Sequence, residues 1–588
     1  MPKFGGYEVN ITNTLMSNPN LSSFTYQPTL RPALPSIYGP QEYRDQAAEY
    51  QNLDAMLRSG LEHTFILQLA TRSSTDWSAA SPAERNQFAK RASLCLRCNL
   101  AKSLTGLSFR ALSVATADST LLNWFISGPS FGTPAAPAKS TFQRYSDMAG
   151  ADLLAEINTA LIRLASTPAT LNPDTGSIDQ PFDLTEAISL ANLYFDGTCL
   201  KTNIHFPTDW ILLRDAVRTL MKGTLLIRRA GLRGRMPQTP EAFLRAINQC
   251  CIAMSQSRRR QDSKRQRKAI LREMKQLVKT VAAHARTHLA LLVDFRAALP
   301  DSGKPAPNAS TGTNTNTSAS ANKNHNASAD PNTGNAPRSA TPLTEARALV
   351  IEKRLQNVLD QLPAATRQAH ERLIGGRPVA NKEKIFSLYE PDVNCLVRGK
   401  ASAEVEFGNK LWLGETESGL IVHYQLLREN QDDSALLVPS VKQLLEQHPE
   451  GSLKTITGDR GTHSAANDKA LAALALESHL CPRGVDAMAA RRANDPAFRQ
   501  AQKRRGGTEA RIAILKNVFL DGLVRSKGHQ HREQSVGWAV LTHNLVVLSD
   551  RLQAQRAEEK EAARKAAQKA GQEAAPPTLP PRQRRPAA

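Results

Sequence analysis

The sequence predicts a multidomain protein in which a helical N-terminal region precedes a mixed α/β domain that is interrupted by a long all-helical insertion. The chain has 588 residues, more than one hydrophobic core usually organises. Apolar residues recur every three or four positions over residues 41–180, 206–299 and 343–380, a spacing typical of helices. Short apolar runs typical of strands occur at 181–205 and, alternating with helical segments, over 381–552.

The N-terminal part is predicted to be a flexible segment, 1–40, followed by a helical domain, 41–180. Within that domain STLLNWFISG and KSTFQRYSDM flank a Pro/Gly-rich break, which predicts two short helices around a turn, with Ser140 as N-cap of the second. If this is a DNA-binding helix-turn-helix, its second helix presents basic and amide side chains to the major groove, namely Lys139, Gln143 and Arg144. An ordinary helical hairpin explains the pattern equally well.

The first strand of the α/β domain and the insertion follow. ANLYFDGTCLKTN predicts a short strand that ends at Asp196, and a helical pattern returns from residue 206. Residues 300–342 are rich in Asn, Ser, Thr, Ala and Gly and have almost no large apolar side chains, so we expect a disordered linker. A basic cluster on the inserted helices is a second candidate contact that could clamp flanking DNA: Arg258, Arg259, Arg260, Lys264, Arg265, Arg267 and Lys268.

The second part of the α/β domain, 381–552, begins with a predicted meander of three strands in EKIFSLYEPDVNCLV, EVEFGNKLWLGE and GLIVHYQLL. After the meander, three helices are predicted in SALLVPSVKQLLEQHP, NDKALAALALE and TEARIAILKNVFL. They alternate with two predicted strands in LKTITGD and SHLCPRG. This order is typical of a mixed α/β layer domain. The basic, charged tail 553–588 is predicted to be a frayed helix that leads into disorder.

Composition indicates a polyanionic partner. Lys and Arg number 75 against 54 Asp and Glu, a formal net charge of +21, so nucleic acid is the leading candidate. The seven cysteines lack the spacing of a disulfide framework, and neither a signal core nor an apolar run of about 18 residues occurs, so we expect a soluble cytoplasmic protein with no membrane partner. Cys95 and Cys98 form a C-x-x-C pair, but no second pair follows, which favours core cysteines over a zinc site.

Three carboxylates are the candidate catalytic and metal-binding residues: Asp196, Asp459 and Glu509. Each is predicted at a strand end or a helix start, and such positions converge at one edge of an α/β sheet. Clustered carboxylates require a cation, and their hard oxygens favour Mg²⁺ or Mn²⁺. Two such ions about 4 Å apart support in-line phosphoryl transfer. Small residues beside the acids leave room for a phosphodiester, namely Gly197, Gly458, Gly461, Gly506 and Gly507.

Other interpretations of these acids are open. Each acid taken singly is more typical of a surface turn or a helix start than of a catalytic site, and only the three together favour a metal site. Asp209, Asp215 and Asp392 also lie near apolar runs and are rival candidates for the first acid, but Asp196 is preferred. Asp209 and Asp215 fall at a predicted helix start, where capping or an ion pair explains them, and Asp392 is expected to mark a bulge or turn. Basic residues around Glu509 are candidate contacts for the DNA backbone, although a solvated helix face also explains them: Arg504, Arg505, Arg511, Lys516, Arg525, Lys527 and Arg532.

Several blocks of the sequence resemble bacterial insertion-sequence transposases with an Asp-Asp-Glu catalytic core, a family similar in fold to ribonuclease H and retroviral integrase. The segment of this chain that resembles the family's first-aspartate block is YFDGTCLKTNIHFPTDWILLRDAVR. The segment that resembles the family's strand pair after the helical insertion is KIFSLYEPDVNCLVRGKASAEVEFGNKLWL. The family's second-aspartate block is matched by ITGDRGTHS, and its glutamate block by GGTEARIAILKNVFLDGLVRSKG. Its closing helix is similar to GWAVLTHNLVVLSDRL. The resemblance runs from about Ser119 to Leu552 and leaves out the Asn/Ser-rich insert.

The resemblance implies a ribonuclease H-like catalytic domain in which Asp196, Asp459 and Glu509 hold two Mg²⁺ ions, with Mn²⁺ as a substitute. It implies cleavage of insertion-sequence ends to free a 3′-hydroxyl, which then attacks target DNA. The implied partners are double-stranded DNA, both terminal inverted repeats and target, and further copies of the chain as a homodimer or higher oligomer in the bacterial nucleoid. A related endonuclease without strand transfer and a catalytically inactive DNA-binding regulator are the alternatives.

Overall fold

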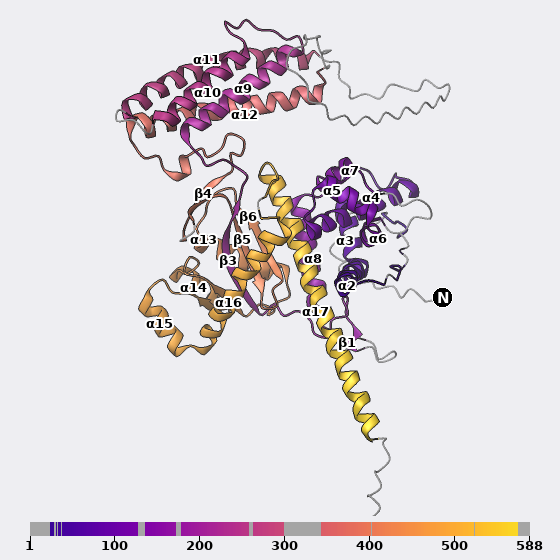
Figure 1. Ribbon diagram of the computed structural model, residues 1–588. Coiled ribbons are helices and arrows are strands. Elements are labelled where there is room, and N and C mark those ends of the chain that lie inside the picture. Colours follow the sequence, from indigo (N-terminus) through magenta and orange to yellow (C-terminus); the bar gives the residue numbers. More distant parts are fainter. Residues whose placement is uncertain are drawn as a thin grey trace, which may run out of the picture. The chain divides into compact units, whose positions relative to one another are not determined.

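The computed structural model describes residues 24–28, 31, 33–36, 38–127, 136–171, 178–257, 263–298, 343–400, 403–522 and 524–573. The predicted linker 300–342 and the candidate DNA contacts Arg258, Arg259 and Arg260 lie outside these residues. The chain divides into two compact units. Unit 1 comprises residues 1–203 and 392–588, and unit 2 comprises residues 204–391 (Figure 1).

The N-terminal part of unit 1 is helical, as the periodicity predicts. Its helices are α2 (Gln41–Met56), α3 (Glu62–Thr71), α4 (Pro82–Thr105), α5 (Phe109–Asp118), α6 (Thr120–Ser127), α7 (Lys139–Ser146) and α8 (Ala151–Ser166), with a π-helical turn η1 (Leu57–Leu61) between α2 and α3. A capping box formed by Ser81 and Glu84, with Pro82 at the first position, starts α4. A small hairpin of β1 (Thr170–Leu171) and β2 (Ile178–Asp179) follows α8.

A fully buried arginine ties these helices together. The Arg97 guanidinium on α4 is 2.7 Å from Asp54 of α2 and 2.9 Å from Glu62 of α3, and it lies 5.5 Å from the ring centroid of Phe125 on α6. Because two carboxylates and a ring face surround it, the buried charge is compensated.

The expectation that residues 1–40 are flexible is wrong for two residues in the described part of that segment. Phe24 is buried and packs edge-on against Trp77 and Phe88. Arg31 donates hydrogen bonds to the carbonyls of Trp124, Phe125 and Ile126 at the end of α6. Burial of an aromatic ring holds Phe24 in place, and the carbonyl groups at the end of a helix hold Arg31. Both partners are distant in the sequence, so the local composition of the N-terminal segment does not reveal them.

The two helices of the possible helix-turn-helix are α6 and α7, and the residues 128–135 between them lie outside the described part of the chain. The prediction that Ser140 caps the second helix is wrong, because α7 begins at Lys139 with Ala138 as N-cap. Phe142 is the buried residue that holds α7 against the domain, while Lys139, Gln143 and Arg144 are exposed. The DNA-binding role of this pair stays a prediction.

The centre of unit 1 is a mixed sheet of six strands: β3 (Asn192–Lys201), β4 (Asn394–Lys400), β5 (Ala403–Thr416), β6 (Ile421–Leu426), β7 (Thr455–Gly458) and β8 (Glu477–Leu480). The long strand β5 pairs antiparallel with β3 on one side and with β4 and β6 along the other. On the far side of β3, β7 and then β8 pair in parallel. The order through the sheet is therefore β6-β5-β3-β7-β8, with β4 continuing the β6 edge.

Helices cover both faces of this sheet. The remaining helices of unit 1 are α13 (Asp433–Gln447), α14 (Ala465–Ala473), α15 (Val485–Asn494), α16 (Pro496–Ile514), the π-helical turn η4 (Leu515–Phe519) and α17 (His529–Glu573). On one face the Trp412 indole of β5 donates to Ser440 of α13 and stacks on Phe195 of β3. On the other, Leu200 and Leu413 share a core with Ile512 of α16. The result is the layered α/β arrangement that the element order predicts.

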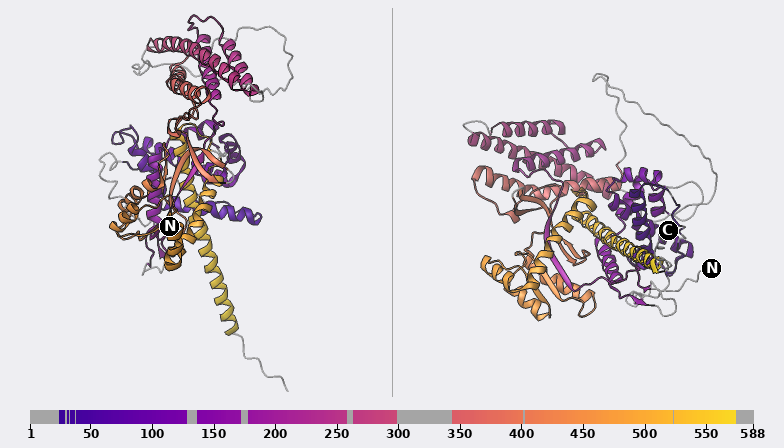
Figure 2. Two further views of the ribbon diagram at one scale, coloured as in Figure 1. Left: turned by 90° about the vertical axis from the view of Figure 1, so that its left-hand side faces the viewer. Right: turned by 60° about the horizontal axis from the view of Figure 1, so that its bottom comes forward.

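Three predicted boundaries of unit 1 differ in the structure. The run EKIFSLYEPDVNCLV is mostly not a strand, since β4 begins only at Asn394 after a turn at Asp392, and Leu388 instead joins the core of unit 2. Helix α16 begins ten residues before Gly506, at Pro496. The tail is helical as far as Glu573, as the C-terminal part of α17, which projects away from the sheet in Figures 1 and 2.

Unit 2 is the helical insertion. It comprises α9 (Asp209–Arg229), α10 (Pro240–Ser257), α11 (Ser263–Ala297), α12 (Glu345–His370), the π-helical turn η2 (Glu371–Gly375) and the short 3₁₀ turn η3 (Asn381–Glu383). The four long helices lie alongside one another around their own apolar core (Figure 2). Asp209 is buried and ion-paired 2.8 Å from Arg372, and Asp215 pairs with Arg214, as the ion-pair interpretation of these acids predicts. Within the described part of the chain, no helix is both long and apolar enough to cross a membrane.

Candidate carboxylate site

Two of the three predicted acids occupy neighbouring positions in the sheet. The parallel ladder of β3 and β7 ends with the pair Phe195 and Gly458, so the next residues are Asp196 and Asp459, on adjacent strands spaced about 5 Å apart. The prediction that Asp196 ends its strand is wrong, because β3 continues to Lys201 by pairing with β5. Asp459 does follow the last residue of β7, and there Thr462 donates its backbone N–H to the Asp459 carboxylate.

The pair carries uncompensated negative charge. The pKa of Asp196 is raised to about 7, mainly by burial and next by the charge of Asp459, and Asp433 adds a smaller effect in the same direction. Arg505 and the backbone N–H of Gly197 oppose the increase without cancelling it. Because the Asp196 side chain is only 14% exposed, water screens this repulsion weakly. The site therefore favours a proton or a bound cation.

A further acid, Asp433, completes this side of the site, and the sequence analysis did not single it out. It is the first residue of α13 and lies 2.8 Å from the Lys410 ammonium of β5. A Cβ atom at Gly197 would lie 2.8 Å from its Oδ1, and one at Gly461 would lie 3.0 Å from its Oδ2. The absence of a side chain at Gly197 and Gly461 therefore makes room for the Asp433 carboxylate. From the sequence alone, these two glycines are explained by the approach of a phosphodiester. In the sequence Asp433 could be recognised only as an acid at the start of a predicted helix. Acids are common at helix starts because they interact favourably with the helix dipole, so this position alone does not indicate a functional site.

The third predicted acid, Glu509, comes from α16 and is 68% exposed. It lies well inside the helix and not one turn from its start, because Gly506 and Gly507 are helical residues and do not open it. Arg505, one turn earlier, is 3.7 Å from Asp196 and 3.9 Å from Glu509. A single guanidinium thus faces the strand acid and the helix acid together.

Helix α16 is held to the sheet by a buried acid. Glu415 of β5 is 2% exposed and accepts a 2.7 Å hydrogen bond from Thr508. Its carboxylate also lies 3.2 Å from Arg504 and 3.6 Å from Arg511. These contacts flank Glu509 in the helix and fix the face that α16 turns to β3.

The oxygen-only donor set fits Mg²⁺ or Mn²⁺. Asp459 and Asp433 both raise the pKa of Asp196, so the three carboxylates are electrostatic neighbours, and carboxylate oxygens are ligands that these ions prefer. Within the described residues, no group of three or more His, Cys, Asp or Glu side chains is already spaced to hold a metal ion. Glu509 is exposed and lies 3.9 Å from the Arg505 guanidinium.

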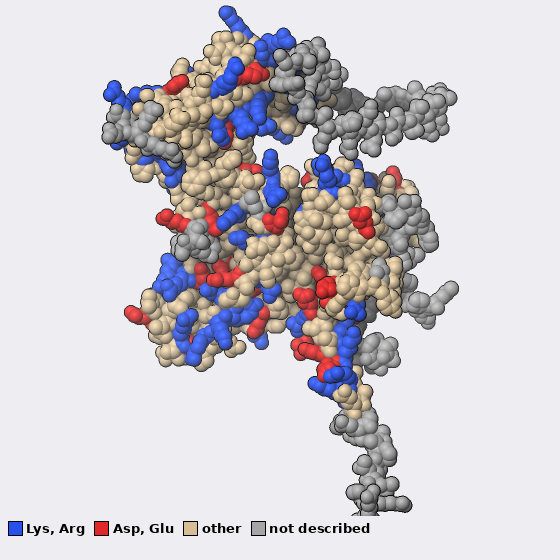
Figure 3. Space-filling view, viewed as in Figure 1, with Lys and Arg blue, Asp and Glu red and all other residues tan. Residues whose placement is uncertain are grey.

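The basic residues predicted around Glu509 fall into different settings. Arg504 and Arg511 face Glu415, and Lys516 donates to the carbonyl of Cys199, so these three have protein partners. Arg525 and Lys527 line a separate cavity together with Gln143 of α7. Exposed basic residues that the sequence analysis missed gather around α15, α16 and the loops near Asp459, beside a group of acidic ones (Figure 3): Arg460, Arg483, Arg492, Arg499 and Lys503.

The cysteine pair on α4 is part of the core, as predicted. Cys95 and Cys98 are both buried, and burial raises the pKa of the Cys95 thiol to about 12. A neutral thiol is a poor ligand for a metal ion.

Comparisons of the chain with protein-family models, curated proteins and solved structures find no match in any of the three.

Proposed function

We propose that this protein is a DNA transposase that cleaves the ends of an insertion sequence and joins the freed 3′-hydroxyl to target DNA by metal-dependent phosphoryl transfer. The observation that carries the proposal is the meeting of Asp196 and Asp459 at adjacent strand positions, with Glu509 facing the same guanidinium from α16. These are the three acids to which the transposase resemblance assigns catalysis.

The architecture supports the same proposal. A three-stranded antiparallel meander, β3-β5-β6, is followed by two strands parallel to β3, and helices cover both faces. We interpret this as a ribonuclease H-like domain. The helical insertion leaves the sheet after β3 and returns before β4.

In the proposed mechanism the strands supply a rigid pair of carboxylates and the helix supplies a mobile one. Asp196 is held by its pairing with β5 and Asp459 directly follows β7, whereas the exposed Glu509 would have to approach them to complete a metal site. When bound, two Mg²⁺ ions stabilise the attacking and leaving oxygens of an in-line displacement. The exposed Arg and Lys side chains around α15 and α16 hold the DNA backbone, and the reaction needs no covalent nucleophile on the protein.

The test is an assay of the full-length protein with labelled element-end DNA, a target plasmid and Mg²⁺. Transposase activity predicts both nicked ends and joined products. Nicked ends without joining would support the nuclease alternative, and binding without either product would leave a DNA-binding regulator.

Matched variants assign the chemistry to the carboxylates. Asp459→Asn should abolish both products while DNA binding remains. Asp486→Asn, which removes an exposed carboxylate on α15, should leave both products unchanged. Cleavage that survives in Asp459→Asn would remove this residue from the site.

A further inference from the structure

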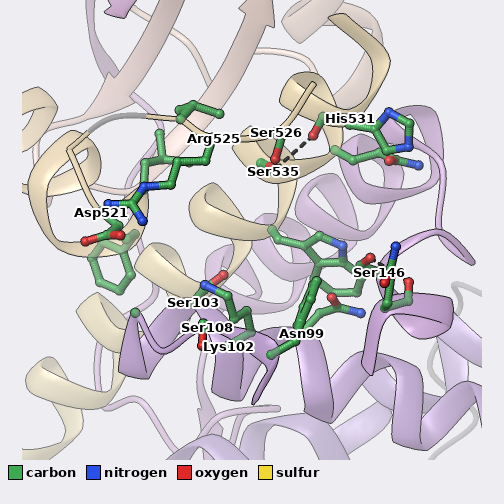
Figure 4. Close-up of a pocket in the computed structure, with 18 of the residues that line it drawn as sticks. Asn99, Lys102, Ser103, Ser108, Ser146, Asp521, Arg525, Ser526, His531 and Ser535 are labelled. Carbon is green, nitrogen blue, oxygen red and sulfur yellow. Dashed lines mark hydrogen bonds between the residues drawn. The ribbon is translucent and has the colours of Figure 1, made fainter. Parts of the chain in front are cut away.

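A cavity of about 650 Å³ lies in unit 1 away from the carboxylate site, between the N-terminal helices and the start of α17. The residues that line it do not include Asp196, Asp459 or Glu509. Figure 4 shows Lys102 of α4 and Arg525, which precedes α17, facing the same space from different walls. Its volume falls within the roughly 300–1,000 Å³ typical of sites for small organic ligands.

The cavity has more positive charge than its walls compensate. Lys102, Arg525 and Lys527 line it, and among the described residues none of the three side chains has an ion pair or a hydrogen bond. Burial lowers the pKa of Lys102; Asp521 opposes this effect, and the nearby Arg525 adds to it. Asp147, the other acid in the wall, already lies 3.9 Å from His531. Three cations thus line the cavity against two acids, and this excess of positive charge favours an anionic ligand.

The remaining walls are suited to a planar ring. Phe109, Phe519 and Trp538 line the cavity, and such aromatic side chains stack on nucleobases. Trp538 is buried, and its indole N–H has no acceptor among the residues that the structure describes. Gln143 and Ser103 add polar groups that can bind a base edge. Cations and aromatic surfaces together match a phosphate attached to a base.

We infer that this cavity binds a nucleotide, with the phosphate on Lys102, Arg525 and Lys527 and the base against the aromatic wall. The nucleotide is either free or a unit of a DNA strand, because both present the same phosphate and base. The inference goes beyond the carboxylate chemistry and does not require it. Gln143, Arg525 and Lys527 come from two distant segments of the chain, and each was predicted from the sequence to contact DNA. In the structure all three line this one cavity.

Binding to the full-length protein should be measured with three probes: inorganic phosphate, dAMP and a short single-stranded oligonucleotide. We expect dAMP to bind at least tenfold more tightly than phosphate. If the oligonucleotide displaces dAMP, the site takes a unit of a DNA strand; if it does not, the site takes the free nucleotide. Equal affinity for phosphate and dAMP would overturn the inference, because the aromatic wall would then have no role.

Charge variants place the binding in this cavity. The double variant Lys102→Gln with Arg525→Gln should weaken dAMP binding about tenfold or more, because it removes charged hydrogen-bond donors. The control is Lys90→Gln with Arg110→Gln, which removes exposed charges from α4 and α5 outside the cavity and should change affinity less than twofold. Unchanged affinity in a folded double variant would overturn the inference.

Two further variants separate this inference from the proposed function and from loss of folding. Asp459→Asn should bind dAMP as the wild type does, whether or not the protein is a transposase. Trp538→Phe should retain part of the binding but lose the quenching of tryptophan fluorescence by the base. If wild type and Trp538→Phe show the same quenching, the ligand lies elsewhere.

Discussion

Asp196 carries an unfavourable charge in the folded protein, first because its side chain is buried and second because Asp459 lies beside it. Its pKa of about 7 lies above the ordinary value of 3.8, so the folded chain keeps a proton that the unfolded chain releases. Stability therefore decreases as pH rises from about 4 to about 7, and the full penalty applies above pH 7. Catalytic carboxylates commonly carry such a penalty before their cation binds.

We expect Asp196→Asn to stabilise the metal-free protein at pH 8 by about 1–3 kcal/mol, because it removes a buried charge. At pH 4 the wild-type carboxyl is protonated, so the two proteins should unfold at nearly the same temperature. Thermal unfolding in the presence of a chelator, at both pH values, measures the difference. Asp486→Asn is the control for loss of an exposed carboxylate, and a pH-independent effect of Asp196→Asn would contradict the account.

Addition of Mg²⁺ should raise the unfolding temperature of the wild type, because a ligand that binds only the folded state stabilises it. The increase should be larger at pH 8 than at pH 5, since the proton on Asp196 competes with the cation. Asp459→Asn should abolish the increase, and NaCl at matched ionic strength should not reproduce it. An equal Mg²⁺ effect at both pH values would argue against binding at Asp196.

Two arginines that share Asp54 allow a buried and an exposed ion pair to be compared. Arg97 has a fully buried side chain and pairs with Asp54 and Glu62, whereas Arg58 is 57% exposed and pairs with Asp54 alone. Arg97→Met should lower the free energy of unfolding by about 3–5 kcal/mol, because it removes the one fully buried cation that pairs with both Asp54 and Glu62 among the described residues. Arg58→Gln should cost less than about 1 kcal/mol. Chemical denaturation measures both, and similar losses would mean that burial is not decisive.

At the scale of elements, the register of β3 against its neighbours creates the site. Pairing with β7 sets Asp196 level with Asp459, and pairing with β5 places Gly408 against the carbonyl of Leu200. Helix α16 then brings Glu509 to the same face because Glu415 anchors it. A shift of one residue in β3 would turn Asp196 to the opposite face of the sheet.

Two glycines are expected to respond to alanine in opposite directions. A Cβ at Gly408 would lie 2.0 Å from the Leu200 carbonyl oxygen, so Gly408→Ala should destabilise unit 1 by more than about 2 kcal/mol. A Cβ at Gly506 meets no atom within 4 Å, and there alanine should stabilise α16 by about 0.5–1 kcal/mol. Denaturant unfolding of both variants tests this, and destabilisation by Gly506→Ala would show that α16 is not helical at that residue.

At the scale of the whole molecule, the two units have separate cores. The apolar residues of α9, α10, α11 and α12 form one core, and the sheet with the N-terminal helices forms others. The insertion leaves and re-enters unit 1 at adjacent places, because Thr202 donates its backbone N–H to Phe407 and Asn409 donates to the carbonyl of Asp392.

We therefore expect unit 1 to fold without the insertion. A variant in which a short Gly/Ser linker joins Asn203 to Asp392 should retain a cooperative unfolding transition and the pH dependence that arises from Asp196. Calorimetry and near-ultraviolet circular dichroism measure both properties. Loss of cooperative unfolding in this variant would show that unit 1 depends on residues 204–391.

The sequence alone indicated most of the helical and strand segments and the position of the insertion, and it named three candidate acids, because periodicity and local residue type carry that information. It placed Asp459 correctly after a strand, but it ended β3 at Asp196 because the pairing with β5 that extends β3 is not a local property. It also could not find Asp433 or the anchoring of Phe24.

Only the tertiary structure decided which charges meet. Arg504 and Arg525 look alike in the sequence, yet the first faces a buried glutamate and the second lines a cavity without an ion-pair partner among the described residues. The physical reason is that electrostatic interactions depend on distance and burial, which the packing of distant segments sets. Residue type along the chain therefore indicates which groups are available, and the fold determines what each one binds.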